Sequence, residues 1–293
     1  MSNVVPVELN LKVGDEVHSL RYRFDLDKFS QNIFHGYLSK GRLYEPDLSM
    51  FVIRVLKKGD VFVDVGAHVG VFSILASKLA GPDGQVIAVE AERDNVDDLL
   101  GHVELNGCRN ITVRNAVLSD SPGPTTFYTN ADNDGGHCLW DPGRHAFNRK
   151  SAANPEPRTV EAETLDSIIG EIKPPAIKIL KMDTEGAEHL IVKGGLETIE
   201  SYRIPFILSE MNDFGLQQLG SSQQAYRSAM KEIGYDTFLM DEQGGFPKLL
   251  PLSVPIQTRM VINVLYSTVD SLAPYWDAER ISWPGPDGPP GQP

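Results

Sequence analysis

The chain has 293 residues, of which 41% are hydrophobic and 8% aromatic. This length and composition allow a full core and suit one large α/β domain with additions. A formal charge of −13 argues against nucleic acid as a partner, because binding to a phosphate backbone needs a basic surface. No apolar stretch reaches the roughly 18 residues that span a bilayer, and no basic and apolar leader opens the sequence. We therefore expect a cytoplasmic protein without membrane contact.

The two cysteines, Cys108 and Cys138, have neither CxxC spacing nor neighbouring histidine clusters. The sequence therefore indicates neither a zinc site nor a disulfide framework, and we expect buried or incidental thiols.

In chain order, alternating apolar and polar residues over 5–24, around Gly14-Asp15, predict an N-terminal β-hairpin within an extension of residues 1–45. A helix is predicted from Pro46, and Gly59 ends it. Strands then follow at 61–65, 86–89, 111–118, 177–182, 206–208, 235–240 and 260–266. Helices are predicted between them at 71–80, 94–105, 188–199 and 225–233.

This alternation predicts a doubly wound, parallel α/β sheet over residues 46–270, with ligands at the carboxyl ends of its strands. The last two strands have no helix between them, so we expect the final strand to run antiparallel.

The polar segment 129–157 interrupts the pattern, and its length is typical of a lid or binding loop. Its neighbours, 125–128 and 158–161, are predicted to pair as a small hairpin. We assign 271–293 to a Pro/Gly-rich tail, in which 284–293 is expected to be disordered.

The turn after the first central strand reads Asp64-Val65-Gly66-Ala67-His68-Val69-Gly70. It departs from the G-x-G-x-x-G of dinucleotide-binding turns, and the acid at the strand end would repel a pyrophosphate. A ligand that carries a positively charged amine and sulfonium suits this acidic turn better than one that carries phosphates. Glu90, about twenty residues further on, is placed to accept both hydroxyls of a ribose. Together these residues predict an adenosine-containing cofactor, with S-adenosylmethionine ahead of NAD.

Several motifs, "VFVDVGAHVG", "VIAVEAERDN", "ETLDSI" and "KILKMDTEGAEHL", resemble those of the FkbM-type S-adenosylmethionine-dependent methyltransferases. The resemblance covers roughly residues 36–212 and is most specific at the D-x-E-G-x-E element that begins at Asp183. It implies a class I methyltransferase fold with seven strands in the order 3-2-1-4-5-7-6, the methylation of hydroxyl groups on natural products or sugars, and S-adenosylhomocysteine as product. Ala91 departs from the family pattern, which has proline after the acid.

The resemblance also implies cofactor contacts. The methionine part would lie against Asp64, Gly66 and Gly70, the ribose against Glu90, and the adenine edge against the stretch 115–120. We expect Glu45 to close over the cofactor. The remaining residues expected at the cofactor are Ala67, His68, Ala91, Ala116, Ser119, Asp183 and Glu185.

For catalysis, an alcohol acceptor needs a general base within hydrogen-bond reach. His137 is the first candidate, because neighbouring glycines allow its loop to close. His68, in the cofactor turn, is the runner-up as base. Asp183, at the end of the fourth strand, is the other catalytic candidate and is expected to orient the cofactor's amine or to contact the substrate; it could instead only cap the following helix. Trp140 and Glu210 are expected at the substrate, together with His137. Asp183, Glu210 and Asp213 could hold magnesium, but no spacing signature favours a divalent metal.

The main hypothesis is therefore an S-adenosylmethionine-dependent O-methyltransferase that acts on a hydroxylated small molecule. An NAD-linked oxidoreductase and a non-catalytic binding protein on a methyltransferase scaffold are the alternatives, and a homo-oligomer is possible.

Overall fold

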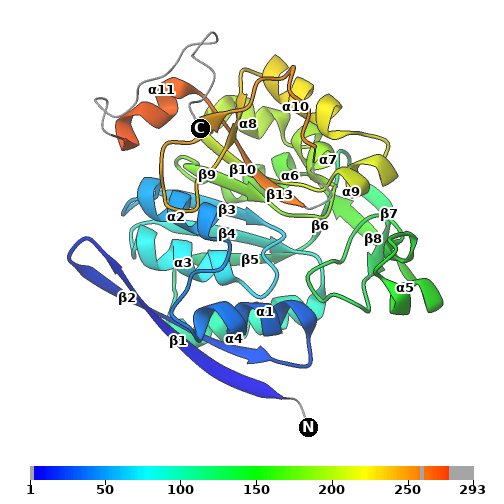
Figure 1. Cartoon of the computed structure of the whole chain (residues 1–293), viewed down its shortest axis with the longest axis horizontal. Helices are drawn as coiled ribbons and strands as arrows, with labels where there is room; N and C mark the ends of the chain where they lie inside the picture. Colours follow the sequence, from blue (N-terminus) through cyan, green and yellow to red (C-terminus); the bar gives the residue numbers. More distant parts are fainter. Residues whose placement is uncertain (1–2, 258–260, 277–293) are drawn as a thin grey trace, which may run out of the picture.

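A computed structural model of the chain describes residues 3–257 and 261–276, so the segment expected to be disordered, 284–293, lies outside the described residues. A central β-sheet carries helices on both faces (Figure 1). It has eight strands in the order β12-β11-β13-β10-β9-β3-β4-β5. These are β3 (Val61–Val65), β4 (Gln85–Glu90), β5 (Ile111–Asn115), β9 (Ile179–Met182), β10 (Phe206–Met211), β11 (Asp236–Leu239), β12 (Lys248–Leu249) and β13 (Ile262–Ser267).

The sheet is mixed, and the α/β class agrees with expectation. Strands β3, β4, β5, β9 and β10 pair in parallel, whereas β13 is antiparallel to both β10 and β11. The expected count of seven strands is wrong, because β12 adds an eighth by pairing antiparallel with β11 at the sheet edge.

The predicted third strand, 111–118, is divided between two sheets. Its first part is β5, and its second part, β6 (Val117–Leu118), belongs to a three-stranded sheet with β7 (Gly123–Thr129) and β8 (Glu156–Glu163). The chain leaves the main sheet where the Asn115 side chain donates to the carbonyl oxygens of Glu90 and Ala91, both at 2.9 Å. The pairing of β7 with β8 confirms the small hairpin predicted at 125–128 and 158–161.

Successive strand residues point to opposite faces of the sheet and contribute to two hydrophobic cores, one on each face. Phe62 packs on the face covered by α2 (Pro46–Val55) and α3 (Val71–Ala80), and Val63 packs on the opposite face. The other helices of the sheet layers are α4 (Arg93–Asn106), α6 (Leu165–Ile172), α7 (Glu188–Lys193), α8 (Leu196–Tyr202), α9 (Asp213–Gln218), α10 (Gln223–Glu232) and α11 (Val269–Leu272). Within the described residues, no helix combines the length and apolar character needed to cross a bilayer.

The predicted helix 188–199 is two helices, α7 and α8, separated by Gly194-Gly195. A Cβ on Gly194 would lie 2.3 Å from the carbonyl oxygen of Ser119, so only glycine permits this close approach between the helix end and the chain after β6.

The N-terminal hairpin is formed by β1 (Val4–Val13) and β2 (Glu16–Asp25), as predicted. Side chains of α4 satisfy part of the outer edge of β2: Asn106 accepts from the Arg21 backbone at 2.9 Å, and His102 accepts from the Arg23 backbone at 3.0 Å. An unpredicted helix, α1 (Phe29–Leu38), follows the hairpin and brings Phe29, Ser30 and Ile33 to the mouth of the main cavity.

Candidate active site

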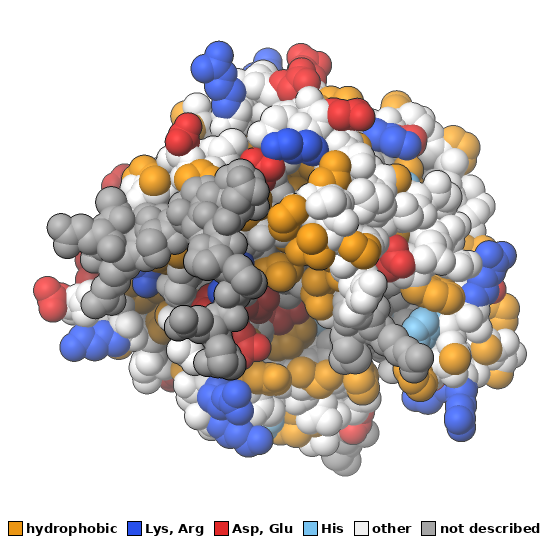
Figure 2. Space-filling model, turned by 45° about the horizontal axis from the view of Figure 1, so that its top comes forward, with side chains coloured by type: hydrophobic (Ala, Val, Ile, Leu, Met, Phe, Trp, Pro, Cys, Tyr) orange, Lys and Arg blue, Asp and Glu red, His pale blue; other side chains and the backbone are white. Residues whose placement is uncertain are grey.

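A cavity of about 500 Å³ lies at the carboxyl edge of the sheet. It lies where β4, β3, β9 and β10 end, and α1 and the insertion 129–157 cover it. Figure 2 shows this face of the molecule hollowed, with acidic side chains in the hollow and hydrophobic side chains around it. The opening is therefore apolar and the interior acidic.

The glycine turn forms one wall of the cavity. Gly66 has φ 73°, and a Cβ placed there would lie 1.8 Å from the carbonyl oxygen of Asp183. Glycine is thus required both by the backbone conformation and by the close approach of the turn to the end of β9. Gly70 has a different role: a Cβ there would lie 2.1 Å from Leu99, so this residue permits packing of α4 and does not line the cavity.

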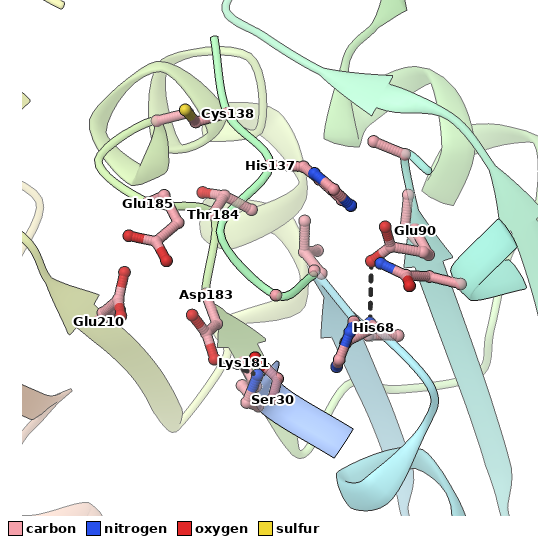
Figure 3. A pocket seen from close by; sticks show the side chains of 18 of the residues that line it. Ser30, His68, Glu90, His137, Cys138, Lys181, Asp183, Thr184, Glu185 and Glu210 are labelled. Carbon is pink, nitrogen blue, oxygen red and sulfur yellow. Dashed lines mark hydrogen bonds and ion pairs between the residues drawn. The ribbon is translucent and has the colours of Figure 1, made fainter. Parts of the chain in front are cut away.

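Glu90 lies at the end of β4 and is held by two backbone groups. Its Oε2 accepts from the N–H of His68 at 2.8 Å (Figure 3), and its Oε1 accepts from the N–H of Glu92 at 2.8 Å. Burial raises the pKa of this carboxyl. Each oxygen keeps a second lone pair, so the carboxylate is oriented towards the cavity with capacity for two further donors.

A buried lysine links strands β3 and β9. Lys181 on β9 is 3% exposed, and its Nζ lies 3.2 Å from Asp183 Oδ2 and 3.5 Å from Asp64 Oδ1. The other Asp64 oxygen accepts from Ser73 at 2.6 Å. Burial opposes the charge on Lys181, but the two carboxylates outweigh it and raise its pKa. Asp64 therefore holds Lys181, which lines the cavity, and does not itself line it, which revises the direct ligand contact expected for Asp64.

Four carboxyl groups line the other end of the cavity, which we call the acidic end: Glu45, Asp183, Glu185 and Glu210. The side chains of Asp183, Glu185 and Glu210 point towards one another in Figure 3. Burial, followed by the charge of Asp183, raises the pKa of Glu45 to about 7 and that of Glu185 to about 8. Burial and the neighbouring Glu185 also raise the pKa of Glu210.

The loop after β9 is tightly supported. Glu185 has φ 56°, which is uncommon for a residue with a side chain. Trp140 donates to its carbonyl oxygen at 2.7 Å, and Asn212 donates to its carboxylate at 2.6 Å. Glu188 is fully buried and accepts from the Thr184 backbone at 2.7 Å. Trp140 thus supports the loop and does not line the main cavity, which revises its expected contact with substrate.

Residues 130–139 of the insertion form a strap across the cavity. Asp134 accepts from the Ser30 backbone at 2.6 Å and lies 3.1 Å from His68 Nε2. Asn95 on α4 donates to the carbonyl oxygen of Asp134 at 3.1 Å. The expected lid is therefore a loop fastened to α1, the glycine turn and α4.

His137 lies in the strap and lines the cavity. Burial lowers its pKa to about 4, and its Nδ1 accepts from the Asn130 backbone at 2.9 Å. The ring is therefore neutral near pH 7 and carries its proton on Nε2, which makes it a donor towards the cavity. This geometry does not support the general-base role expected for His137.

The cavity gathers most of the residues expected from the sequence and omits a few. Its lining includes Glu45, Gly66, Ala67, His68, Glu90, Ala91, Ala116, His137, Asp183, Glu185 and Glu210. Ser119 does not line it, because its chain segment packs against Gly194.

Asp213 also lies apart from the cavity, with its carboxylate accepting from Gln217 and Gln223. The three residues weighed as a possible magnesium site are thus not brought together, and the described residues include no group of three or more His, Cys, Asp or Glu side chains that could hold a metal ion. The sequence analysis missed Lys181. It could have been found from its spacing, because residues two apart in a strand point to the same face, which places Lys181 beside Asp183.

The family model described as the methyltransferase FkbM domain matches residues 64–237, more than half of the chain. The chain belongs to the FkbM methyltransferase family. The matched range contains the glycine turn, Glu90, the strap, Lys181 and most of the acidic end; Glu45 lies before it.

Among solved structures, this FkbM-family chain is similar to a methyltransferase FkbM from Methylobacillus flagellatus KT, with 17% identity and a TM-score of 0.40. The alignment covers 80% of this chain and 52% of that chain, so the chain spans about half the length of that relative. Similarity to a putative O-methyltransferase from Klebsiella pneumoniae has 12% identity and a TM-score of 0.42, over 76% of this chain and 80% of that chain. No curated protein sequence matches the chain significantly.

Proposed function

We propose that this FkbM-family chain is an S-adenosylmethionine-dependent methyltransferase that methylates a hydroxyl group of a small natural product or sugar. The observation that carries the proposal is the single cavity that joins Glu90 and the Gly66 turn at one end to the acidic end at the other. Membership of the family agrees with it. We assign the catalytic domain to residues 46–270, with 1–45 as an extension.

The residues present fit S-adenosylmethionine. Glu90 offers two oriented oxygens to the ribose hydroxyls, and Ala91 and Ala116 leave room for an adenine ring beside them. The Gly66 turn provides a surface without side chains. Asp183, directly beside this turn at the end of β9, complements the positively charged amine and sulfonium of the cofactor.

The bound cofactor would supply a methyl group on a positively charged sulfur, which a correctly placed oxygen nucleophile can displace. The protein's own contribution is to orient the acceptor, exclude water and take up the hydroxyl proton. The strap and α1 exclude water by covering the cavity. Asp183 is the proposed proton acceptor, because its ion pair with Lys181 uses Oδ2 and leaves Oδ1 for the acceptor hydroxyl.

Methyl transfer can be tested with S-adenosylmethionine carrying a ¹³C-labelled methyl group and a low-molecular-weight extract of hydroxylated metabolites. We expect a new O–CH₃ resonance in the NMR spectrum, together with S-adenosylhomocysteine. Asp183→Asn should lower kcat by about 10²–10⁴-fold, the usual contribution of a general base. Transfer of the label only to nitrogen or carbon would contradict O-methylation, and unchanged kcat in Asp183→Asn would contradict the assigned base.

A further inference from the structure

The acidic end contains more carboxyl groups than the protein's own cations can pair with. Lys181 is the one Lys or Arg side chain among the described residues that line the cavity, and it is already shared between Asp64 and Asp183. Glu45, Glu185 and Glu210 therefore line the cavity without a described cationic partner.

Two carboxylate oxygens at this end also lack hydrogen bonds. Glu45 Oε2 and Glu210 Oε2 are buried, and neither has a partner among the described residues. A buried polar atom without a partner is costly, and both residues face a cavity that can admit a donor. The arrangement is that of a binding site for a ligand that brings hydrogen-bond donors.

The cofactor does not account for Glu210, at the far part of this end. Glu90 and Glu210 lie at the ends of strands β4 and β10, which are three positions apart in the sheet and thus separated by about 14 Å at the usual strand spacing. With the ribose at Glu90, the methionine part lies over the Gly66 turn, on β3, and Asp183 ends β9 beside it. Glu210 and Asn263, on β10 and β13, lie beyond, where the acceptor must approach the methyl group.

We propose that the acceptor carries a protonated amine, which Glu45, Glu185 and Glu210 bind through their carboxylates, and an apolar portion that lies against the hydrophobic mouth of the cavity. An ammonium group brings up to three donors and a positive charge, which matches the unpartnered oxygens and the uncompensated charge. At the mouth, Phe29 is 57% exposed and Ile33 is 37% exposed, which is consistent with covering by an apolar ligand portion.

This inference rests on the proposed function, because it assumes that the Glu90 end holds the cofactor. The raised pKa values of Glu45 and Glu185 support it: burial favours their protonated forms in the free protein, and a bound cation would restore the ionised forms.

The test uses the full chain saturated with S-adenosylhomocysteine and titrated calorimetrically with tyramine, n-butylamine and phenethylamine, each against its neutral N-acetyl derivative. We expect at least one amine to bind about 10-fold or more tightly than its N-acetyl derivative, the size expected for a hydrogen bond to a charged group. Glu210→Gln and Glu45→Gln should remove that preference. Glu197→Gln, a matched change at an exposed position on α8, should retain it.

Equal affinity for amines and N-acetyl derivatives, or no binding of any amine, would overturn the inference. A preference for amines that survives both Glu210→Gln and Glu45→Gln would also overturn it, because the amine would then bind elsewhere. The first titration separates the two proposals: failure of S-adenosylhomocysteine to bind contradicts the proposed function, whereas normal binding of it without a preference for amines contradicts this inference alone.

Discussion

At the scale of single residues, Lys181 has the largest electrostatic role in the site. It is buried between Asp64 and Asp183, and Asp64 is itself fully buried. Lys181→Met should lower the free energy of unfolding by about 3–5 kcal/mol, because it leaves a buried charge without its partner. Urea unfolding measures this loss. The double variant Asp64→Asn/Lys181→Met removes both charges and should recover most of the stability; equal losses in the single and double variants would contradict the pairing.

His137 provides a second test at this scale. Because its Nδ1 accepts from the Asn130 backbone and burial lowers its pKa to about 4, we expect it to donate from Nε2 and not to act as the base. His137→Gln, which can both accept and donate, should reduce kcat less than 10-fold, well short of the roughly 10²–10⁴-fold of a general base. A larger loss, together with disappearance of the acid-side inflection from the pH dependence of kcat, would restore the base assignment.

At the scale of elements, the strap determines access to the cavity. Asp134 fastens it to Ser30 and His68, and charge-assisted hydrogen bonds of this kind are stronger than neutral ones. Asp134→Ala should increase the dissociation rate of S-adenosylhomocysteine by about 10-fold or more. Asp134→Asn keeps an acceptor for the Ser30 N–H and should have a smaller effect. Equal, unchanged rates in both variants would show that the strap does not limit ligand release.

The elements also show what the sequence could predict. Alternation of strands and helices placed Glu90, Asp183 and Glu210 at one sheet edge, because parallel strands present their carboxyl ends together. Helix α1 was not predicted, since its N-cap, Lys28, makes no side-chain cap and the helix is held by tertiary contacts such as that of Gln31 with Asp98 on α4 at 2.8 Å.

The strap contacts could not be predicted either. His68 and Asp134 are 66 residues apart, and their contact depends on the fold of an aperiodic loop. For the same reason Trp140 was expected at the substrate, whereas its indole supports the loop of Glu185. Sequence patterns thus located the strand ends, and loop geometry decided which side chains reach the cavity.

At the scale of the whole molecule, the acidic end should make stability depend on pH. A carboxyl with a raised pKa binds its proton more tightly in the folded than in the unfolded protein. Its contribution to the free energy of unfolding is therefore complete below the unfolded pKa of about 4.3 and is lost as pH rises through the folded pKa. Glu45 and Glu185 titrate near 7 and 8. His137 has a lowered pKa, and its contribution is complete above its unfolded pKa of about 6.5.

We therefore expect the Tm of the ligand-free protein to fall between about pH 6.5 and 8.5, with a smaller fall in Glu185→Gln. Differential scanning calorimetry at constant ionic strength measures both, with Glu197→Gln as control. A Tm that rises with pH over this range would show that the acidic end is compensated by other charges.

The central claim is that the cavity between the Gly66 turn and the acidic end binds S-adenosylmethionine through Glu90. Calorimetric titration of the full chain with S-adenosylhomocysteine, and separately with NAD, tests it most directly. We predict micromolar binding of S-adenosylhomocysteine and none of NAD, with affinity reduced at least 10-fold in Glu90→Gln, in line with loss of charged hydrogen bonds. Binding of NAD alone, or affinity for S-adenosylhomocysteine unchanged in Glu90→Gln, would contradict the account.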